Sequence, residues 1–267
     1  MGMIVVRDNL VYIHVETVSH LILSYGISRT DFITSIPRLP TNILSLNPVD
    51  YENEIDIATG FNTVTGEENI ARYLNKGTTG VKQNWIDFDS QDDLELITPR
   101  EVSEFLYLGH TFSHIQSPFY YKLQNDYVFL TLPNDALKIY YRYLNQFYSV
   151  FSKSVIRHAN RAYREKNGLF RRRPMMLEKV PKSITEELMP LFVEGAVLDF
   201  SMMTVNNTKL SVPVYVMVDS IYQMKWHEPT LETESAKLVA SLDYDFSDQE
   251  WSIVISNQAA FEDSIVF

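Results

Sequence analysis

Three stretches of the chain alternate apolar and polar side chains with a period of two residues, and this pattern constrains the fold more than any other feature. Apolar residues recur at every second position in residues 11–15, 238–244 and 251–255. Because successive side chains of a strand point to opposite faces, a period of two predicts strands with one apolar face. Such strands are typical of antiparallel hairpins, in which one face packs on the core and the other meets water.

Short turn-forming segments separate further pairs of strands. Asn206-Asn207-Thr208 lies between two apolar runs, and Asn125-Asp126 lies between two more. Asn and Asp favour tight turns because their side chains bond to nearby backbone amides. A third strand after Pro133 extends the second pair into a meander. The predicted strands outside the alternating C-terminal stretches are residues 4–6, 10–16, 85–88, 119–124, 127–132, 137–143, 197–205 and 210–218.

Helices are predicted where a capping signal precedes apolar residues spaced three or four apart. Thr98 can cap such a stripe, with Pro99 at the first helical position and Glu101 placed to close a capping box. Ser183-Ile184-Thr185-Glu186 has the form of a second capping box. The predicted helices are residues 18–25, 67–75, 99–109, 145–167 and 183–194.

These elements predict an α+β fold. Mostly antiparallel sheets, made of hairpins and a meander, are expected to carry three or four helices packed against them. A length of 267 residues suits one large domain or two modest ones. We expect one continuous globular domain over residues 1–267. If two lobes exist, the boundary is expected in the acidic loop, giving residues 1–92 and 93–267.

The composition excludes several classes of protein. The chain contains no cysteine, so disulfides, thiolate catalysis, zinc fingers and iron–sulfur ligation are excluded together. Its first residues lack the basic and apolar regions of a signal peptide, and the longest apolar run, Val212–Val218, is too short to cross a bilayer. By elimination we expect a cytoplasmic protein with no membrane partner.

No motif assigns a reaction or a cofactor. The nine glycines form neither a dinucleotide-binding nor a phosphate-binding loop, and there is no nucleophile elbow. His110 and His114 are four residues apart and would share one face of a helix, where two imidazoles could hold a metal. The catalytic form of this motif has Glu beside the first His, where Thr111 stands. We therefore expect hydrogen-bonded histidines and no metal or cofactor.

Two acidic groups were weighed as cation sites. Four carboxylates alternate over residues 50–56, but a calcium loop would need Gly and Glu where Ile55 and Phe61 stand. An exposed edge strand guarded by charge explains the alternation equally well. Five further acidic residues lie in residues 87–95 and are expected to form a solvent-exposed loop. Neither group is assigned as a metal site.

Positive charge is confined to one short segment of an acidic chain. The formal net charge is −11, yet residues 157–173 carry seven basic side chains and one acidic, which leaves −17 for the rest. Helical spacing places Arg157, Arg161 and Arg164 on one face. Arg171, Arg172 and Arg173 follow a turn that could fold them back beside the helix. These six arginines are the predicted binding site for an anionic partner; the other interpretation is that they neutralise the protein's own carboxylates.

Two functions from different classes fit the sequence. The preferred one is a non-enzymatic interaction or regulatory protein, whose partner is a protein or a small anionic ligand rather than nucleic acid, since the chain is acidic overall. The alternative is a hydrolase with dispersed Asp, His and Ser residues, metal-assisted at His110 and His114. The 16 Tyr and 15 Phe residues also suggest a homodimer, if they exceed what the core can bury.

Overall fold

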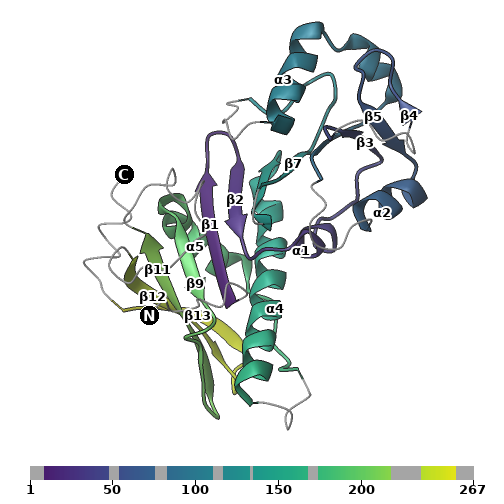
Figure 1. The fold of residues 1–267 in the computed structure, drawn as a ribbon. Coiled ribbons are helices and arrows are strands. Elements are labelled where there is room, and N and C mark those ends of the chain that lie inside the picture. Colours follow the sequence, from purple (N-terminus) through teal and green to yellow (C-terminus); the bar gives the residue numbers. More distant parts are fainter. Residues whose placement is uncertain are drawn as a thin grey trace, which may run out of the picture. The chain divides into compact units, whose positions relative to one another are not determined.

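The computed structural model describes residues 9–47, 54–75, 83–110, 117–132, 135–167, 174–217 and 236–256. These residues form helices and antiparallel sheet, which confirms the α+β class (Figure 1). The chain divides into two compact units. Unit 1 comprises residues 1–15, 24–31 and 148–267, and unit 2 comprises residues 16–23 and 32–147. The expected single domain, and the alternative boundary at 92/93, stay predictions.

The sheet of unit 1 has the strand order β13-β12-β11-β9-β1, and each neighbouring pair is antiparallel. β10 pairs with β11 across the predicted turn, where Asn206 Oδ1 accepts the N–H groups of Thr208 at 2.9 Å and Lys209 at 2.7 Å. The strands are β1 (Leu10–Glu16), β9 (Ala196–Asp199), β10 (Thr204–Val205), β11 (Lys209–Met217), β12 (Ala236–Asp245) and β13 (Glu250–Ile255).

Two long helices cover apolar surface in unit 1. α4 (Phe147–Asn167) buries a stripe that includes Val155 and Ala159, and α5 (Lys182–Glu194) contacts β9, β11 and β13. The ring centroids of Phe151 and Phe192 are 5.2 Å apart, so the two helices also contact each other. Both helices agree with the ranges predicted from the sequence.

An extended segment, residues 174–181, joins α4 to the sheet of unit 1, and we call it the strap. On one side, the Met175 N–H donates to Asn160 Oδ1 at 2.6 Å and the Val180 N–H donates to Ser152 Oγ at 2.9 Å. On the other side, the Glu178 N–H donates to the Tyr244 hydroxyl at 3.3 Å, and the Trp251 indole donates to the Glu178 carbonyl at 2.8 Å. The strap is therefore held between α4 and the sheet by hydrogen bonds that each involve one side chain.

The sheet of unit 2 has the order β8-β7-β6-β3-β5-β4, and its neighbouring pairs are also antiparallel. These strands are β3 (Asn42–Ser45), β4 (Glu54–Ile55), β5 (Asn62–Thr65), β6 (Trp85–Phe88), β7 (Tyr127–Thr131) and β8 (Leu137–Tyr141). Its helical elements are α2 (Glu67–Asn75), the 3-10 helix Gln91–Leu96 and α3 (Pro99–His110). β2 (Leu21–Tyr25) and α1 (Arg29–Ile33) cross the sequence boundaries between the units.

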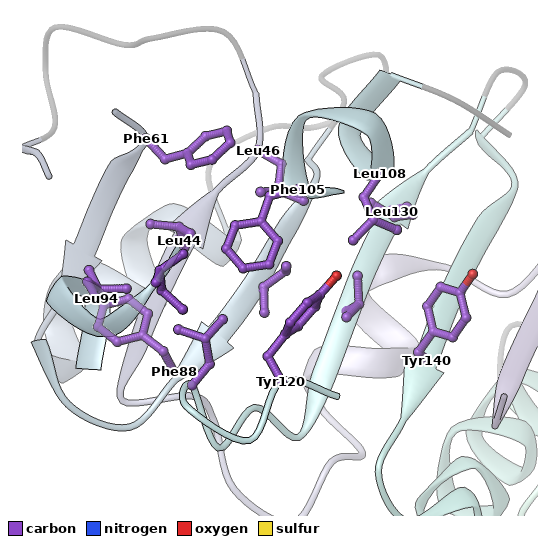
Figure 2. Close-up of a cluster of buried hydrophobic side chains, with 14 of the residues drawn as sticks. Leu44, Leu46, Phe61, Phe88, Leu94, Phe105, Leu108, Tyr120, Leu130 and Tyr140 are labelled. Atoms are coloured by element: carbon purple, nitrogen blue, oxygen red, sulfur yellow. The ribbon is translucent and has the colours of Figure 1, made fainter. Parts of the chain in front are cut away.

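One face of the unit 2 sheet packs against α3 (Figure 2). Phe105 of α3 lies among sheet residues and meets the Tyr120 ring edge-on at 4.7 Å. The predicted capping box holds the start of this helix, because the Thr98 N–H donates to Glu101 Oε2 at 2.7 Å and the Glu101 N–H donates to Thr98 Oγ1 at 3.4 Å. Hydrophobic burial then fixes the helix on the sheet.

The other face of the unit 2 sheet buries an aromatic cluster around Phe32. Trp85 and Phe129 are register partners on β6 and β7, and their rings stack at 5.1 Å with 3° between the planes. Phe32 lies within 6.1 Å of both rings and also contacts Tyr127 and Tyr141. Much of the aromatic content therefore serves the core of unit 2.

Three local predictions were wrong. Residues 18–25 contain strand β2 and no helix, because Leu21, Ile22 and Leu23 are all buried and Gly26 makes a turn with φ +83°. Residues 121–124 form turns, held by buried Asn125, whose Oδ1 accepts the Tyr120 N–H at 2.8 Å. α5 begins after Pro181, so Ser183 does not cap it.

Candidate functional site

The described part of the cationic segment predicted from the sequence, residues 157–167, lies on the C-terminal half of α4, in unit 1. Arg157 is committed to an internal ion pair. Its Nη2 atom is 2.7 Å from Asp31 Oδ2, and its Nε atom is 3.0 Å from each Asp31 oxygen. The Asp31 side chain is 2% exposed, whereas that of Arg157 is 36% exposed. Arg157 thus compensates a buried carboxylate and keeps one side toward solvent.

The loop before α1 holds Asp31 in place. The Ser28 N–H donates to Asp31 Oδ2 at 2.9 Å, and the Asp31 N–H donates to Ser28 Oγ at 3.0 Å. Gly26 has φ +83°, and a Cβ there would lie 2.1 Å from the Leu10 carbonyl oxygen. Only glycine suits this close approach to β1, and the Gly26 carbonyl is left free to accept from α4.

The Gly26 carbonyl accepts from Arg157 Nη2 at 2.6 Å, and His158 is the second group of α4 bound to it. Its Nε2 atom lies 2.7 Å from the Gly26 oxygen, and because a carbonyl only accepts, Nε2 carries the hydrogen. Nδ1 is buried without a hydrogen-bond partner, and the ring stacks on Phe200 with centroids 5.2 Å apart. Burial, and next the neighbouring Arg157, lower the pKa of His158 to about 4. The imidazole is therefore neutral near pH 7.

The remaining arginines of the predicted site differ in their surroundings. Arg161 Nε donates to Glu165 Oε1 at 2.9 Å, and Glu165 Oε2 accepts from the Asn9 amide at 2.9 Å. Arg164 is exposed and donates to the Asn160 carbonyl, one turn earlier, at 3.3 Å. Within the described ranges, no carboxylate forms an ion pair with Arg164. Arg171, Arg172 and Arg173 lie outside the described residues.

An exposed cationic strip runs along α4. Lys153 and Arg164 are three helical turns apart and share a face with Arg157 and Asn160. Lys153 is also exposed, and no carboxylate in the described part of the chain pairs with it. The strap adds Met176, which is 95% exposed and follows the Met175 amide bound to Asn160. We call Lys153, Arg157, Arg164 and Met176 the α4 face.

Sequence reasoning placed Asp87 in an exposed loop, and this was wrong. Asp87 lies on β6 of unit 2 and is 8% exposed. Its Oδ1 accepts the Tyr127 N–H at 2.6 Å, and its Oδ2 accepts the Asp126 N–H at 2.9 Å. Burial raises the pKa of Asp87 to about 7, against the two amide bonds that lower it. The strand over residues 85–88 was predicted, but grouping Asp87 with the acidic residues that follow concealed its burial.

Arg142 binds the segment that precedes β7. Its Nε atom donates to the Asn125 carbonyl at 2.7 Å and is 3.2 Å from Asp126 Oδ1. The Asp87 oxygens are held by the backbone amides of Asp126 and Tyr127 in the same segment. The arrangement anchors the start of β7, which follows directly in the sequence.

The described structure does not test the metal-assisted alternative. His110 is the last residue of α3, and His114 lies outside the described residues. Asp56 accepts from the Thr59 N–H and hydroxyl in a turn, while Glu54 lies on β4. In the part of the chain that is described, no group of three His, Cys, Asp or Glu side chains is arranged to hold a metal. No described helix has both the length and the apolar character to cross a membrane.

Comparisons with known proteins give no relative. No family model matches the chain, and searches of curated proteins and of solved structures return no match.

Proposed function

We propose that this chain is a non-enzymatic interaction protein that binds an acidic partner through the α4 face. One observation carries the proposal. Lys153 and Arg164 are exposed on one side of α4 and have no carboxylate partner among the described residues, although the chain has 34 acidic side chains and only 23 basic ones. In such an acidic protein, unpaired cations aligned over three turns favour a role in binding.

The internal pairs refine which arginines take part. Arg157 and Arg161 already contact Asp31 and Glu165, so neither can give a full guanidinium to a partner. Arg157 keeps part of its side chain in solvent between Lys153 and Arg164 and adds charge to the strip. The principal contacts therefore fall to Lys153 and Arg164, with Arg157 in support. This interpretation refines the helical part of the site expected from the sequence, while Arg171, Arg172 and Arg173 lie outside the described residues and stay part of the prediction.

The surroundings indicate the chemistry of the partner. Guanidinium and ammonium groups bind carboxylates or phosphates through charge-assisted hydrogen bonds. Exposed Met176 offers an adaptable apolar contact beside these charges. A net charge of −11 repels the continuous phosphate backbone of nucleic acid, which favours a compact acidic peptide or a small anion. Such binding is expected to weaken as salt rises.

The test is a charge reversal measured against a matched control. The double variant Lys153→Glu/Arg164→Glu is compared with Arg72→Glu/Arg100→Glu, which changes the net charge equally at two exposed arginines of unit 2. The probe is a fluorescent glutamate-rich peptide, whose binding is followed by anisotropy at low and high salt, and inorganic phosphate is added as an unlabelled small-anion competitor. We expect at least about a tenfold loss of affinity for the α4 variant alone, a loss equivalent to about 1.4 kcal/mol. Equal losses in both variants, or no binding by the wild type, would refute the proposal.

The hydrolase alternative stays a prediction, because one member of its histidine pair lies outside the described residues. Substrate screening of the purified protein, with and without added divalent metal, addresses it directly. A turnover abolished by His110→Ala would favour the enzyme over the interaction protein.

A further inference from the structure

β13 ends the sheet of unit 1, and within the described residues β12 is its one neighbouring strand. Edge strands are usually short, charged, bulged or interrupted by proline, because their open backbone groups pair readily with other chains. β4, at the end of the unit 2 sheet, follows this rule because it is only two residues long and one of them, Glu54, is charged. β13 has six residues, Glu-Trp-Ser-Ile-Val-Ile, with a single charge at its first position.

The hydrogen bonds of β12 show which backbone groups of β13 are open. The Ser256 N–H donates to the Val239 carbonyl at 3.0 Å, so these residues form a hydrogen-bonded pair. Such pairs alternate along an antiparallel ladder. With Ser241 opposite Val254 and Asp243 opposite Ser252, the next hydrogen-bonded pairs involve Val254 and Ser252. The N–H and C=O groups of the alternate residues, Trp251, Ile253 and Ile255, therefore point away from β12.

We propose that β13 pairs with β13 of a second copy of the chain, antiparallel, about a two-fold axis at Ile253. This register uses all three open residues, because Ile253 meets Ile253 and Trp251 meets Ile255 of the second copy. Each of these pairs exchanges two backbone hydrogen bonds. Closed two-fold pairing is the commonest form of self-association, and here the strand is its own complement.

The side chains fit the same register. Trp251 opposite Ile255 and Ile253 opposite Ile253 are aromatic and β-branched pairs, which stabilise neighbouring strands. Val254 and Ile255 are 44% and 38% exposed, and pairing would cover them. Glu250 falls opposite Ser256 at each end, so the two carboxylates lie at opposite ends of the interface. No like charges face each other across it.

The first experiment uses the alternation of backbone N–H groups along β13, which point by turns to β12 and to the open edge. Proline lacks an N–H, so Ile253→Pro removes a donor that faces the second copy, whereas Val254→Pro removes a donor to β12. Sedimentation of the wild type at high micromolar concentration is expected to show twice the 31.0 kDa monomer mass. Ile253→Pro is expected to be monomeric with an unchanged circular dichroism spectrum, and Val254→Pro to lower the melting temperature.

The second experiment does not depend on tolerance of proline. The chain has no cysteine, so introduced thiols can pair only with each other. In the proposed register Ser252 faces Val254 of the second copy in a non-hydrogen-bonded pair, with Cα atoms about 4.5 Å apart, which suits a disulfide. An equimolar mixture of Ser252→Cys and Val254→Cys is expected to form a disulfide-linked dimer on mild oxidation, and each variant alone is not.

Three results would overturn the proposal. They are a wild type that sediments as a monomer, a dimer that survives Ile253→Pro, and cross-linking that is as strong in either single variant as in the mixture.

Discussion

The two units each bury an aspartate, and they satisfy it in different ways. In unit 1, Asp31 receives three contacts from the Arg157 guanidinium at 2.7–3.0 Å. In unit 2, the Asp87 oxygens accept two backbone N–H groups from Asp126 and Tyr127. The positive charge of Arg157 compensates the Asp31 carboxylate, whereas Asp87 accepts hydrogen bonds from neutral backbone amides only. Burial therefore raises the pKa of Asp87 to about 7.

The comparison extends to the effect of pH. The network around Asp31 includes His158, and burial lowers the pKa of this histidine to about 4. A fall in pH therefore protonates an imidazole that unit 1 keeps neutral. In unit 2, a rise in pH charges Asp87, which burial keeps protonated. The units should respond to pH in opposite directions. Burial is the largest cause of both shifts, and the directions differ because an imidazole becomes charged as pH falls whereas a carboxyl becomes charged as pH rises.

The largest effect is expected from removing the compensating charge of unit 1. Arg157→Met leaves Asp31 buried without its cation, which should lower the free energy of unfolding of unit 1 by about 3–5 kcal/mol. Denaturant-dependent hydrogen exchange of α4 and β1 amides measures it. The control is Arg164→Met. Arg164 lies on the same face of the same helix but has no carboxylate partner in the described residues, so its replacement should change the free energy of unfolding by less than about 0.5 kcal/mol. Similar losses in both variants would contradict the assigned role of the ion pair.

The next effect is the pH dependence of unit 2. A carboxyl whose folded pKa lies above its unfolded value stabilises the fold below the unfolded pKa, and this stability is lost as pH rises. For Asp87 the window is pH 3.8 to about 7. At about 1.4 kcal/mol per pKa unit, the loss is of the order of 4 kcal/mol. Hydrogen exchange in β6 and β7 should show it, and Asp87→Asn should abolish the dependence; an unchanged slope in that variant would assign it to another group.

A slightly smaller effect of opposite sign is expected in unit 1. His158 has a folded pKa of about 4 against an ordinary 6.5, so the stability of its neutral form is present above pH 6.5 and is lost as pH falls toward 4. The loss is of the order of 3 kcal/mol. The protection factors of α4 amides, which are corrected for the intrinsic pH dependence of exchange, should fall on acidification, and His158→Gln should flatten the response. Parallel pH slopes in the two units would remove the contrast between them.

Local signals in the sequence identified the main elements. The capping box at Thr98, the stripe of α4 and the alternation in β12 and β13 each depend on residues within a few positions of one another. The same signals misled where tertiary contacts decide the outcome. Gly26 resembles a helix stop, but it is required because the chain passes close to Leu10. In the sequence, Asn125-Asp126 has the form of a hairpin turn between two strands. In the structure, the buried Asn125 side chain instead binds the backbone of Tyr120 and Pro118, in the segment before β7.

The site was only partly predictable for the same reason. Spacing placed Arg157, Arg161 and Arg164 on one helix, and the structure has that helix. Nothing near Arg157 in the sequence pointed to Asp31, because the pair joins segments more than a hundred residues apart. Lys153 lies outside the cationic segment defined from the sequence, and only its exposure and its lack of a carboxylate partner among the described residues distinguish it. Asp87 was hidden by the acidic residues that follow it.

The interleaving of the two units has a consequence for synthesis on the ribosome. Unit 2 uses residues 16–23 and 32–147, so its segments have all emerged before α4 is complete. Unit 1 must wait, because Leu10 on β1 pairs with Asp199 on β9, which is synthesised only after α4 and α5. Bringing such distant segments together is slow. Until then, Val11 and Ile13, which are fully buried in the finished fold, lack that partner strand and are suitable contacts for a chaperone.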